Sequence, residues 1–274
     1  MRILSLETTP FLEWRYLNAA PRGGTRVERL PLLRGWVDAL PPGVEAVLAT
    51  SDLQGMATSA HHDGAATLLG EFLADEVAMQ GAAGELPLAS NTGVLLAGDL
   101  YSNDLADKRG ASGDVRSVWN AFTESFRWVA GVAGNHDMFG EPGGFERFRH
   151  KSRAHVLDGD LAELDGLRVG GVSYIIGRPD KTNRREQSAQ LERIESVLLQ
   201  EPQVLVLHEG PDAPEQSLPG NAFIREAVAP WNDLLIICGH SHWDVPLVPL
   251  PGGVQVLNVD ARAVLLQPIA SKST

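Results

Sequence analysis

The sequence has 274 residues, 43% of them hydrophobic and 21% charged, which is ordinary globular composition and excludes a largely disordered chain. The 35 Asp and Glu residues outnumber the 23 Lys and Arg residues, and the resulting net charge of −12 argues against non-specific nucleic-acid binding, which needs clustered basic residues. The single cysteine, Cys238, excludes an intramolecular disulfide and is expected to be a small core residue.

The chain shows no sign of a membrane segment. No apolar run approaches the roughly 18 residues that a membrane-spanning helix needs. Glu7 interrupts the N-terminus before the apolar region of a signal peptide could form. We therefore expect a cytoplasmic protein without a membrane partner.

The first 43 residues predict a strand at Arg2–Leu6 and a helix at Leu30–Leu40. No linker rich in Pro, Gly or Ser divides the chain, so residues 1–274 are predicted to form a single domain, with residues 1–43 as a strand and helix that elaborate it.

Short runs rich in Val, Leu and Ile follow and predict strands buried on both faces. These runs are Val44–Leu48, Val94–Ala97, Val129–Ala133, Leu167–Ile176, Val204–Leu207, Leu234–Ile237, Val254–Leu257 and Ala263–Leu266. Helical spacing of apolar residues predicts helices at Ala65–Met79, Val115–Trp128, Glu186–Leu199 and Asn221–Val228. The alternation indicates an α/β fold with a largely parallel sheet. The strands from Leu234 onward follow one another without a helix and predict an antiparallel addition or a second sheet.

Five of the strand-like runs end in polar residues of the kinds that bind metal ions. Ligands gather beyond the carboxyl ends of strands in open α/β sheets, so we expect these residues to converge. Their carboxylate, amide and imidazole groups suit Mn, Fe, Zn or Ni better than Ca or Mg alone. The residues are Asp52, Asp99, Asn135, His136, Asp137, His208, His240 and His242.

In their order, these clusters resemble the signature of calcineurin-like metallophosphoesterases, D-x-H, GD, GNH[D/E], H and GHxH. The matching segments are Asp52, Gly98-Asp99, Gly134-Asn135-His136-Asp137, His208 and Gly239-His240-Ser241-His242. The resemblance implies a four-layer α/β/β/α sandwich with a dinuclear metal centre. It also implies hydrolysis of a phosphomonoester or phosphodiester by in-line attack of a metal-activated hydroxide.

The resemblance divides the ligands between two divalent transition-metal ions. Asp52 and His242 would bind the first ion. The second would be bound by Asn135, His208 and His240, with Asp99 bridging both. The sequence departs from the signature at Gln54, where the family has His. An amide oxygen is a weaker ligand than imidazole for these metals, so we expect the first site to be weak or empty.

The remaining roles concern the phosphorylated substrate. By the resemblance, His136 would stabilise the phosphoryl oxygens or protonate the leaving group, and Asp137 would hydrogen-bond the His136 ring. Arg178 and Arg184 lie in a basic stretch of an otherwise acidic chain. They would either bind substrate phosphate or belong to a solvated loop.

Two alternatives remain. A non-catalytic binding or scaffold protein of the same family is favoured by Gln54 and opposed by the intact GNHD and GHSH motifs. A lactamase-like metallohydrolase would be expected to carry an H-x-H-x-D-H cluster, which is absent from the sequence. Four further histidines are predicted to be surface residues, with His61 and His62 alternatively reaching the site. They are His61, His62, His150 and His155.

Overall fold

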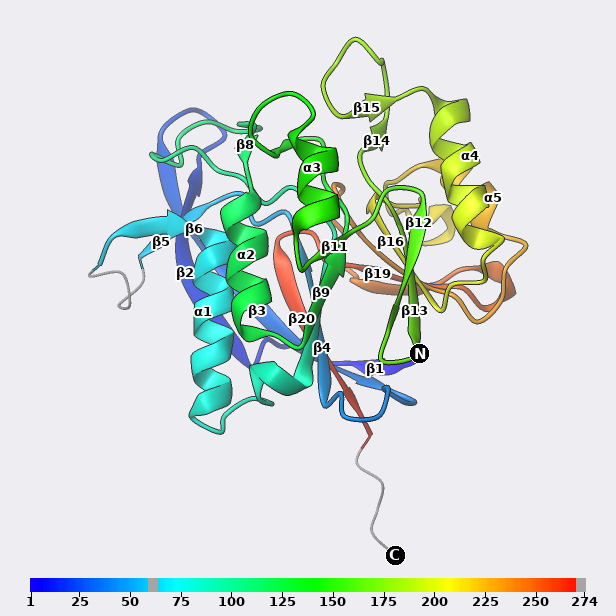
Figure 1. Ribbon diagram of the computed structural model, residues 1–274, viewed down its shortest axis with the longest axis horizontal. Coiled ribbons are helices and arrows are strands. Elements are labelled where there is room, and N and C mark those ends of the chain that lie inside the picture. The colour runs from blue at the N-terminus through cyan, green and yellow to red at the C-terminus, as the bar shows by residue number, and fades with distance from the viewer. Residues whose placement is uncertain (59–63, 270–274) are drawn as a thin grey trace, which may run out of the picture.

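A computed structural model describes residues 1–58 and 64–269, so the predictions for His61 and His62 lie outside the described residues. Two β-sheets pack face to face, and helices cover the outer face of each sheet (Figure 1). The fold is therefore the four-layer α/β/β/α sandwich that the motifs imply. No helix in the described part of the chain is long and apolar enough to cross a membrane.

The first sheet has the strand order β11-β9-β7-β4-β20-β3-β2-β5-β6, with β1 paired to β3. Its strands are β1 (Ile3–Leu6), β2 (Leu12–Ala19), β3 (Thr25–Val37), β4 (Ala46–Ser51), β5 (Met56–Thr58), β6 (Ala66–Leu68), β7 (Thr92–Leu96), β9 (Trp128–Gly131), β11 (His155–Val156) and β20 (Arg262–Pro268). Strands β4, β7 and β9 are parallel neighbours and are buried along their whole length. This burial explains their unbroken apolar sequences.

The second sheet has the order β12-β13-β16-β17-β19-β18. Its strands are β12 (Asp160–Leu164), β13 (Leu167–Val172), β16 (Val204–Glu209), β17 (Leu235–Gly239), β18 (Leu247–Pro249) and β19 (Gln255–Asn258). Two short parallel pairs lie outside the sheets: β8 (Gly113–Asp114) with β10 (Asp137–Met138), and β14 (Ile175–Ile176) with β15 (Arg184–Arg185).

Helices α1 (Leu69–Ala82) and α2 (Arg116–Ser125) cover the first sheet, and α4 (Gln187–Leu198) and α5 (Ala222–Val228) cover the second. A further helix, α3, spans Gly144–Lys151. Trp119 and Phe122 of α2 are fully buried against the first sheet. Burial of a side chain such as Phe122 contributes roughly 1.5–3 kcal/mol. The α/β layers thus form a rigid base for the loops at the strand ends.

The helix predicted at Leu30–Leu40 is wrong, because this segment lies in strand β3. Leu30 and Leu32 face the helix layer, whereas Leu33 and Val37 face the second sheet. A strand buried on both faces has a continuous apolar sequence, which imitates helical spacing. Pro31 gave no warning, because proline is accepted in the first turn of a helix; in the structure it lies in the middle of β3.

Other differences are confined to element ends and to the last strands. The segment predicted as a helix from Ala65 begins as strand β6, and Trp128, predicted in a helix, begins β9. Strands β17 and β19 are parallel, and β18 is antiparallel to β19. Strand β20 returns to the first sheet between β4 and β3.

Candidate metal centre

Five strands bring the polar motifs to the edge where the two sheets meet. Strands β4, β7 and β9 are parallel in the first sheet, β16 and β17 are parallel in the second, and one motif lies at the end of each. Gly239 at the end of β17 lies so close to Ser51 and Asp52 that an added Cβ would collide with the Ser51 hydroxyl. Glycine at this position therefore allows the two edges to touch.

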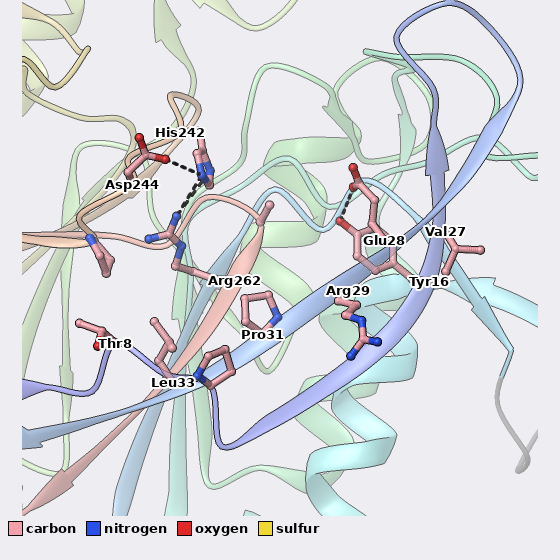
Figure 2. Close-up of a pocket in the computed structure, with 13 residues that line it drawn as sticks. Thr8, Tyr16, Val27, Glu28, Arg29, Pro31, Leu33, His242, Asp244 and Arg262 are labelled. Atoms are coloured by element: carbon pink, nitrogen blue, oxygen red, sulfur yellow. Dashed lines mark hydrogen bonds and ion pairs between the residues drawn. The ribbon is translucent and has the colours of Figure 1, made fainter.

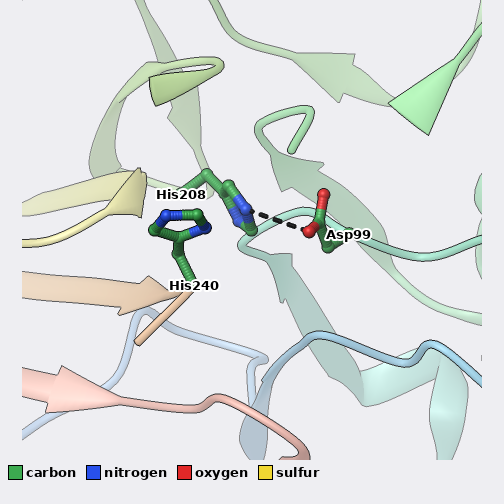
Figure 3. A group of neighbouring side chains, drawn as sticks. All are labelled: Asp99, His208 and His240. Carbon is green, nitrogen blue, oxygen red and sulfur yellow. Dashed lines mark ion pairs between the residues drawn. The ribbon is translucent and has the colours of Figure 1, made fainter. Parts of the chain in front are cut away.

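Three side chains form the centre of this edge (Figure 3). Asp99, His208 and His240 each offer one ligand atom, and these atoms lie within 4.8 Å of one another. His208 Nε2 is 3.3 Å from Asp99 Oδ2 and 3.2 Å from Asn135 Oδ1. Four of the predicted ligands are therefore brought together. Two imidazoles, a carboxylate and an amide oxygen form a donor set that fits a divalent transition-metal ion.

The orientation of His208 is that of a typical metal ligand. Its Nδ1 lies 2.8 Å from the carbonyl oxygen of Ala97, so Nδ1–H donates to this oxygen and Nε2 is directed at Asp99. Metal-ligating histidines usually donate their second ring N–H in this way, which fixes the tautomer and the ring orientation.

The charges of the cluster are strongly coupled. Burial disfavours the charged forms of His208 and Asp99, but their mutual attraction outweighs it, so the pKa of His208 is raised to about 10 and that of Asp99 is lowered. Burial and the positive charge of His208 lower the pKa of His240 to about 4. In the ion-free protein, the proton on His208 thus supplies the positive charge beside Asp99 that a bound cation would otherwise supply.

Three candidate ligands lie in the left-handed backbone region, with φ of 54° at Asp52, 54° at Asp99 and 67° at His240. This conformation is unfavourable for residues other than glycine, and such residues cluster at functional sites. Next to Asp99, a Cβ on Gly98 would come within 2.5 Å of the Gly134 backbone nitrogen. The GD and GNHD loops are therefore in direct contact, which only a residue without a side chain permits.

The expected hydrogen bond between Asp137 and the His136 ring is wrong. The buried Asp137 carboxylate accepts from the backbone N–H groups of Asp99 (2.9 Å), Leu100 (2.7 Å) and Gly134 (2.8 Å). Burial and the nearby Asp99 charge raise the pKa of Asp137 to about 6. Asp137 therefore holds the two motif loops together and acts on the site through the position of Asp99.

His136 instead has a hydroxyl partner that the sequence did not reveal. Its Nδ1 lies 3.0 Å from Ser112 Oγ, and its backbone N–H donates to Asp99 Oδ1 at 2.9 Å. Ser112 belongs to the loop between β7 and β8, and Gly110 of the same loop lies against the His136 ring. No motif marks Ser112, because the contact arises only when this loop folds over the GNHD segment.

Asp52 and Gln54, predicted for the first ion, adjoin the cluster. Asp52 Oδ2 accepts from the His240 backbone N–H at 3.0 Å and from the Ser51 hydroxyl. The Gln54 amide donates to Asp99 Oδ2 at 3.3 Å. Asp52 Oδ2 and the Gln54 amide nitrogen are thus engaged with neighbouring groups of the protein.

His242, also predicted for the first ion, has separate partners. Its Nδ1 lies 2.8 Å from Asp260 Oδ2, and both ring nitrogens lie within 3.5 Å of Arg262 Nη2. Among the described residues, Asp99, His208 and His240 form the one metal-competent group of His, Cys, Asp or Glu side chains. Asp260 and Arg262 come from the C-terminal strand region and follow no motif that could have indicated them.

The two arginines considered for substrate binding differ in their surroundings. Arg178 lies 3.5 Å from Asp180, whereas no ion pair of Arg184 is found among the described residues. The neighbours of Arg184 are anchored, because Asn183 donates to the Asp137 carbonyl at 2.6 Å and Arg185 pairs with Asp158 at 2.5 Å. This places Arg184 beside the GNHD loop.

The remaining predictions concern residues away from the cluster. Cys238 is buried in the core of the second sheet, as predicted. His150 and His155 are exposed, also as predicted.

Comparison with known proteins identifies one family. The model of the family described as calcineurin-like phosphoesterase matches residues 46–244. Among solved structures, the chain is similar to a 5′-nucleotidase precursor from Thermus thermophilus, with 17% identity, a TM-score of 0.43, and coverage of 79% of this chain and 48% of that chain. It is also similar to the Thermus thermophilus sulfate thiohydrolase SoxB, with 16% identity, a TM-score of 0.45, and coverage of 82% and 53%. The chain thus spans about half the length of these structures. No curated protein matches it.

Proposed function

The chain belongs to the calcineurin-like phosphoesterase family, and from this premise we propose that it is a metal-dependent hydrolase of small phosphomonoesters or phosphodiesters. The observation that carries the proposal is the convergence of Asp99, His208 and His240 at the edge of the two sheets. A bound divalent ion there would polarise a phosphoryl oxygen and lower the pKa of a water molecule.

The protein's own side chains divide the work. Asp99, Asn135, His208 and His240 hold the ion. His136 faces the same edge and hydrogen-bonds the developing phosphoryl charge or donates a proton to the leaving oxygen, while its ring is oriented by Ser112.

Arg184 is the substrate-binding cation of the proposal. It has no ion pair with a carboxylate among the described residues, and its neighbour Asn183 is hydrogen-bonded to the GNHD loop. We do not assign this role to Arg178, which is paired with Asp180.

The first ion site is proposed to be the weaker of two. Gln54 replaces a histidine, and His242 is engaged by Asp260 and Arg262. The same observations favour the second candidate function, a family member that binds a phosphorylated ligand without hydrolysing it.

The test starts from metal-free protein reloaded separately with Mn²⁺, Fe²⁺, Zn²⁺ or Ni²⁺. Bound ions per chain and hydrolysis of p-nitrophenyl phosphate and bis(p-nitrophenyl) phosphate are followed together. We expect at least one ion to bind and one of the two esters to be hydrolysed, with both properties lost in His208→Ala. Ion binding without hydrolysis of either ester would favour the non-catalytic alternative, and absence of ion binding would overturn both.

A further inference from the structure

A cleft of about 690 Å³ lies beside the GHSH loop, between that loop and one face of strand β3 (Figure 2). Val27, Arg29, Pro31 and Leu33 form its floor. These residues are two apart along β3, so their side chains project from the same face of the strand. His242 and Arg262 line the end of the cleft at the GHSH loop, which also carries His240 of the metal cluster.

The cleft exists because β3 is longer than the part of the sheet that the second sheet covers. Leu33 and Val37 pack in the core between the sheets. Val27, on the same face, is 64% exposed, and neither Val27 nor Pro31 belongs to that core. The other face of β3 is closed by the helix layer through Leu30 and Leu32. One apolar face of the strand is therefore left open next to the candidate site.

We infer that this cleft binds the leaving group of the phosphoester and that this group is an uncharged, largely apolar alcohol. The inference rests on the proposed function. It follows from continuity, because the backbone N–H of Ala261, which lines the cleft, donates to the Ser51 carbonyl next to Asp52. Asp52 Oδ2 in turn accepts from the backbone N–H of His240 in the metal cluster.

The two ends of the cleft differ in charge. At the metal end, Arg262 is buried and donates to the Trp243 carbonyl at 2.7 Å, with its guanidinium against the His242 ring. Away from that end, Val27, Pro31 and Leu33 make most of the floor apolar, and the charged floor residue Arg29 is paired with Glu13. A cationic end beside an apolar floor fits a molecule with an anionic phosphoryl group at one end and an apolar group at the other.

The remaining charged side chains favour an uncharged leaving group. Glu28 accepts hydrogen bonds from Tyr16 at 2.9 Å and Asn18 at 2.7 Å, and Arg29 pairs with Glu13 at 2.8 Å. The Asp244 carboxylate at the rim has a 99% exposed side chain. Its negative charge disfavours a second phosphate, so a leaving group that itself carries phosphates is a poor fit.

Much of the cleft is formed by residues outside the part of the chain that matches the family. That part spans residues 46–244, whereas β3 and Arg262 lie outside it. A substrate preference of this chain is therefore expected to arise here, on the elaborated N-terminal segment, and not in the motif loops.

The experiment compares phenyl phosphate with 4-tert-butylphenyl phosphate, whose leaving groups have similar acidity but different apolar area. We expect wild-type kcat/KM to be about tenfold higher for the larger ester, since part of the added apolar area would be buried against the cleft floor. Val27→Glu should abolish this preference, because it places a carboxylate on the apolar part of the floor. Leu4→Glu is the matched control, because Leu4 is 51% exposed on β1 of the same sheet and does not line the cleft.

A binding measurement separates this inference from the proposed function. Calorimetry with phenylphosphonate and 4-tert-butylphenylphosphonate on metal-loaded protein needs no turnover. Tighter binding of the larger phosphonate that is lost in Val27→Glu supports the cleft even if neither ester is hydrolysed. The missing hydrolysis would then contradict the proposed hydrolase and not the cleft. Equal binding of the two phosphonates in the wild type, or an equal loss in Leu4→Glu, would overturn the cleft assignment.

Discussion

The two halves of the candidate metal centre differ in the folded chain, and one of them already departs from the family signature in the sequence, at Gln54. In one half, Asp99, Asn135 and His208 direct their polar atoms at one another, and His240 lies against them. In the other half, Asp52 accepts hydrogen bonds, and His242 is held by Asp260 and Arg262. The comparison teaches that a motif supplies a ligand type, while the partners behind the ligand decide where its donor atom points.

His208→Ala should have the largest effect, because it removes the residue that contacts both Asp99 and Asn135. His208 is fully buried and pairs with Asp99, so the substitution leaves a buried carboxylate without its partner. We expect the free energy of unfolding of the metal-free protein to fall by about 3–5 kcal/mol. Urea unfolding in the presence of a chelator measures this change, and His150→Ala, at an exposed position, is the control. A stability equal to the wild type would show that the pair is not formed.

His136→Ala separates chemistry from ion binding. The His136 side chain contacts Ser112 and none of the clustered ligand atoms, so its loss should reduce turnover by about 10²–10⁴-fold. Bound ions per chain, measured by mass spectrometry, should stay at the wild-type level. Loss of the ions, or unchanged turnover, would show that His136 has another role. Ser112→Ala should reduce turnover less, since it leaves the ring in place.

Arg184→Gln tests which cation serves the substrate. A hydrogen bond to a charged group contributes about 1.5–3 kcal/mol, so we expect kcat/KM to fall by roughly 10- to 150-fold with ion content unchanged. Arg178→Gln, in the same segment but paired with Asp180, should behave like the wild type. Equal effects of the two substitutions would indicate a general electrostatic contribution in place of a specific contact.

Gln54→His should produce the smallest change, and it sharpens the comparison of the two halves directly. Under limiting metal, the native protein should retain a single ion per chain, and the imidazole should raise occupancy of the weaker site. A metal titration of both proteins, followed by bound ions and ester hydrolysis, measures the effect. Two ions bound with equal affinity in the native protein, with no change in the variant, would contradict a weak first site.

Much of the fold was predictable because local sequence and burial agree. The unbroken apolar runs at β4, β7, β16 and β17 predicted buried strands, and the motifs at their ends predicted which edge of the sheets carries the site. The prediction for β3 was wrong for the same reason that the predictions for the other strands were right. A strand buried on both faces carries no alternation, so its apolar spacing does not distinguish it from a helix.

The parts of the site that could not be predicted depend on contacts between distant segments. Ser112 meets His136 only through a loop fold, and Asp260 and Arg262 meet His242 only because β20 returns to the first sheet. Asp137 had a predicted partner on the adjacent residue, but its carboxylate reaches backbone donors in two different loops. Sequence spacing predicts which residue types approach the site, whereas side-chain direction is set by packing.

The left-handed backbone at Asp52, Asp99 and His240 has a consequence for which ion the protein accepts. Each such residue costs roughly 1–2 kcal/mol relative to ordinary backbone geometry, and the surrounding sheets hold it there before any ion arrives. The donor atoms of such a site move little in response to the size of the bound ion. We therefore expect the site to prefer ions whose radius and preferred geometry match the fixed spacing of the donors over ions that need the loops to shift, even when the latter bind nitrogen and oxygen more strongly in solution.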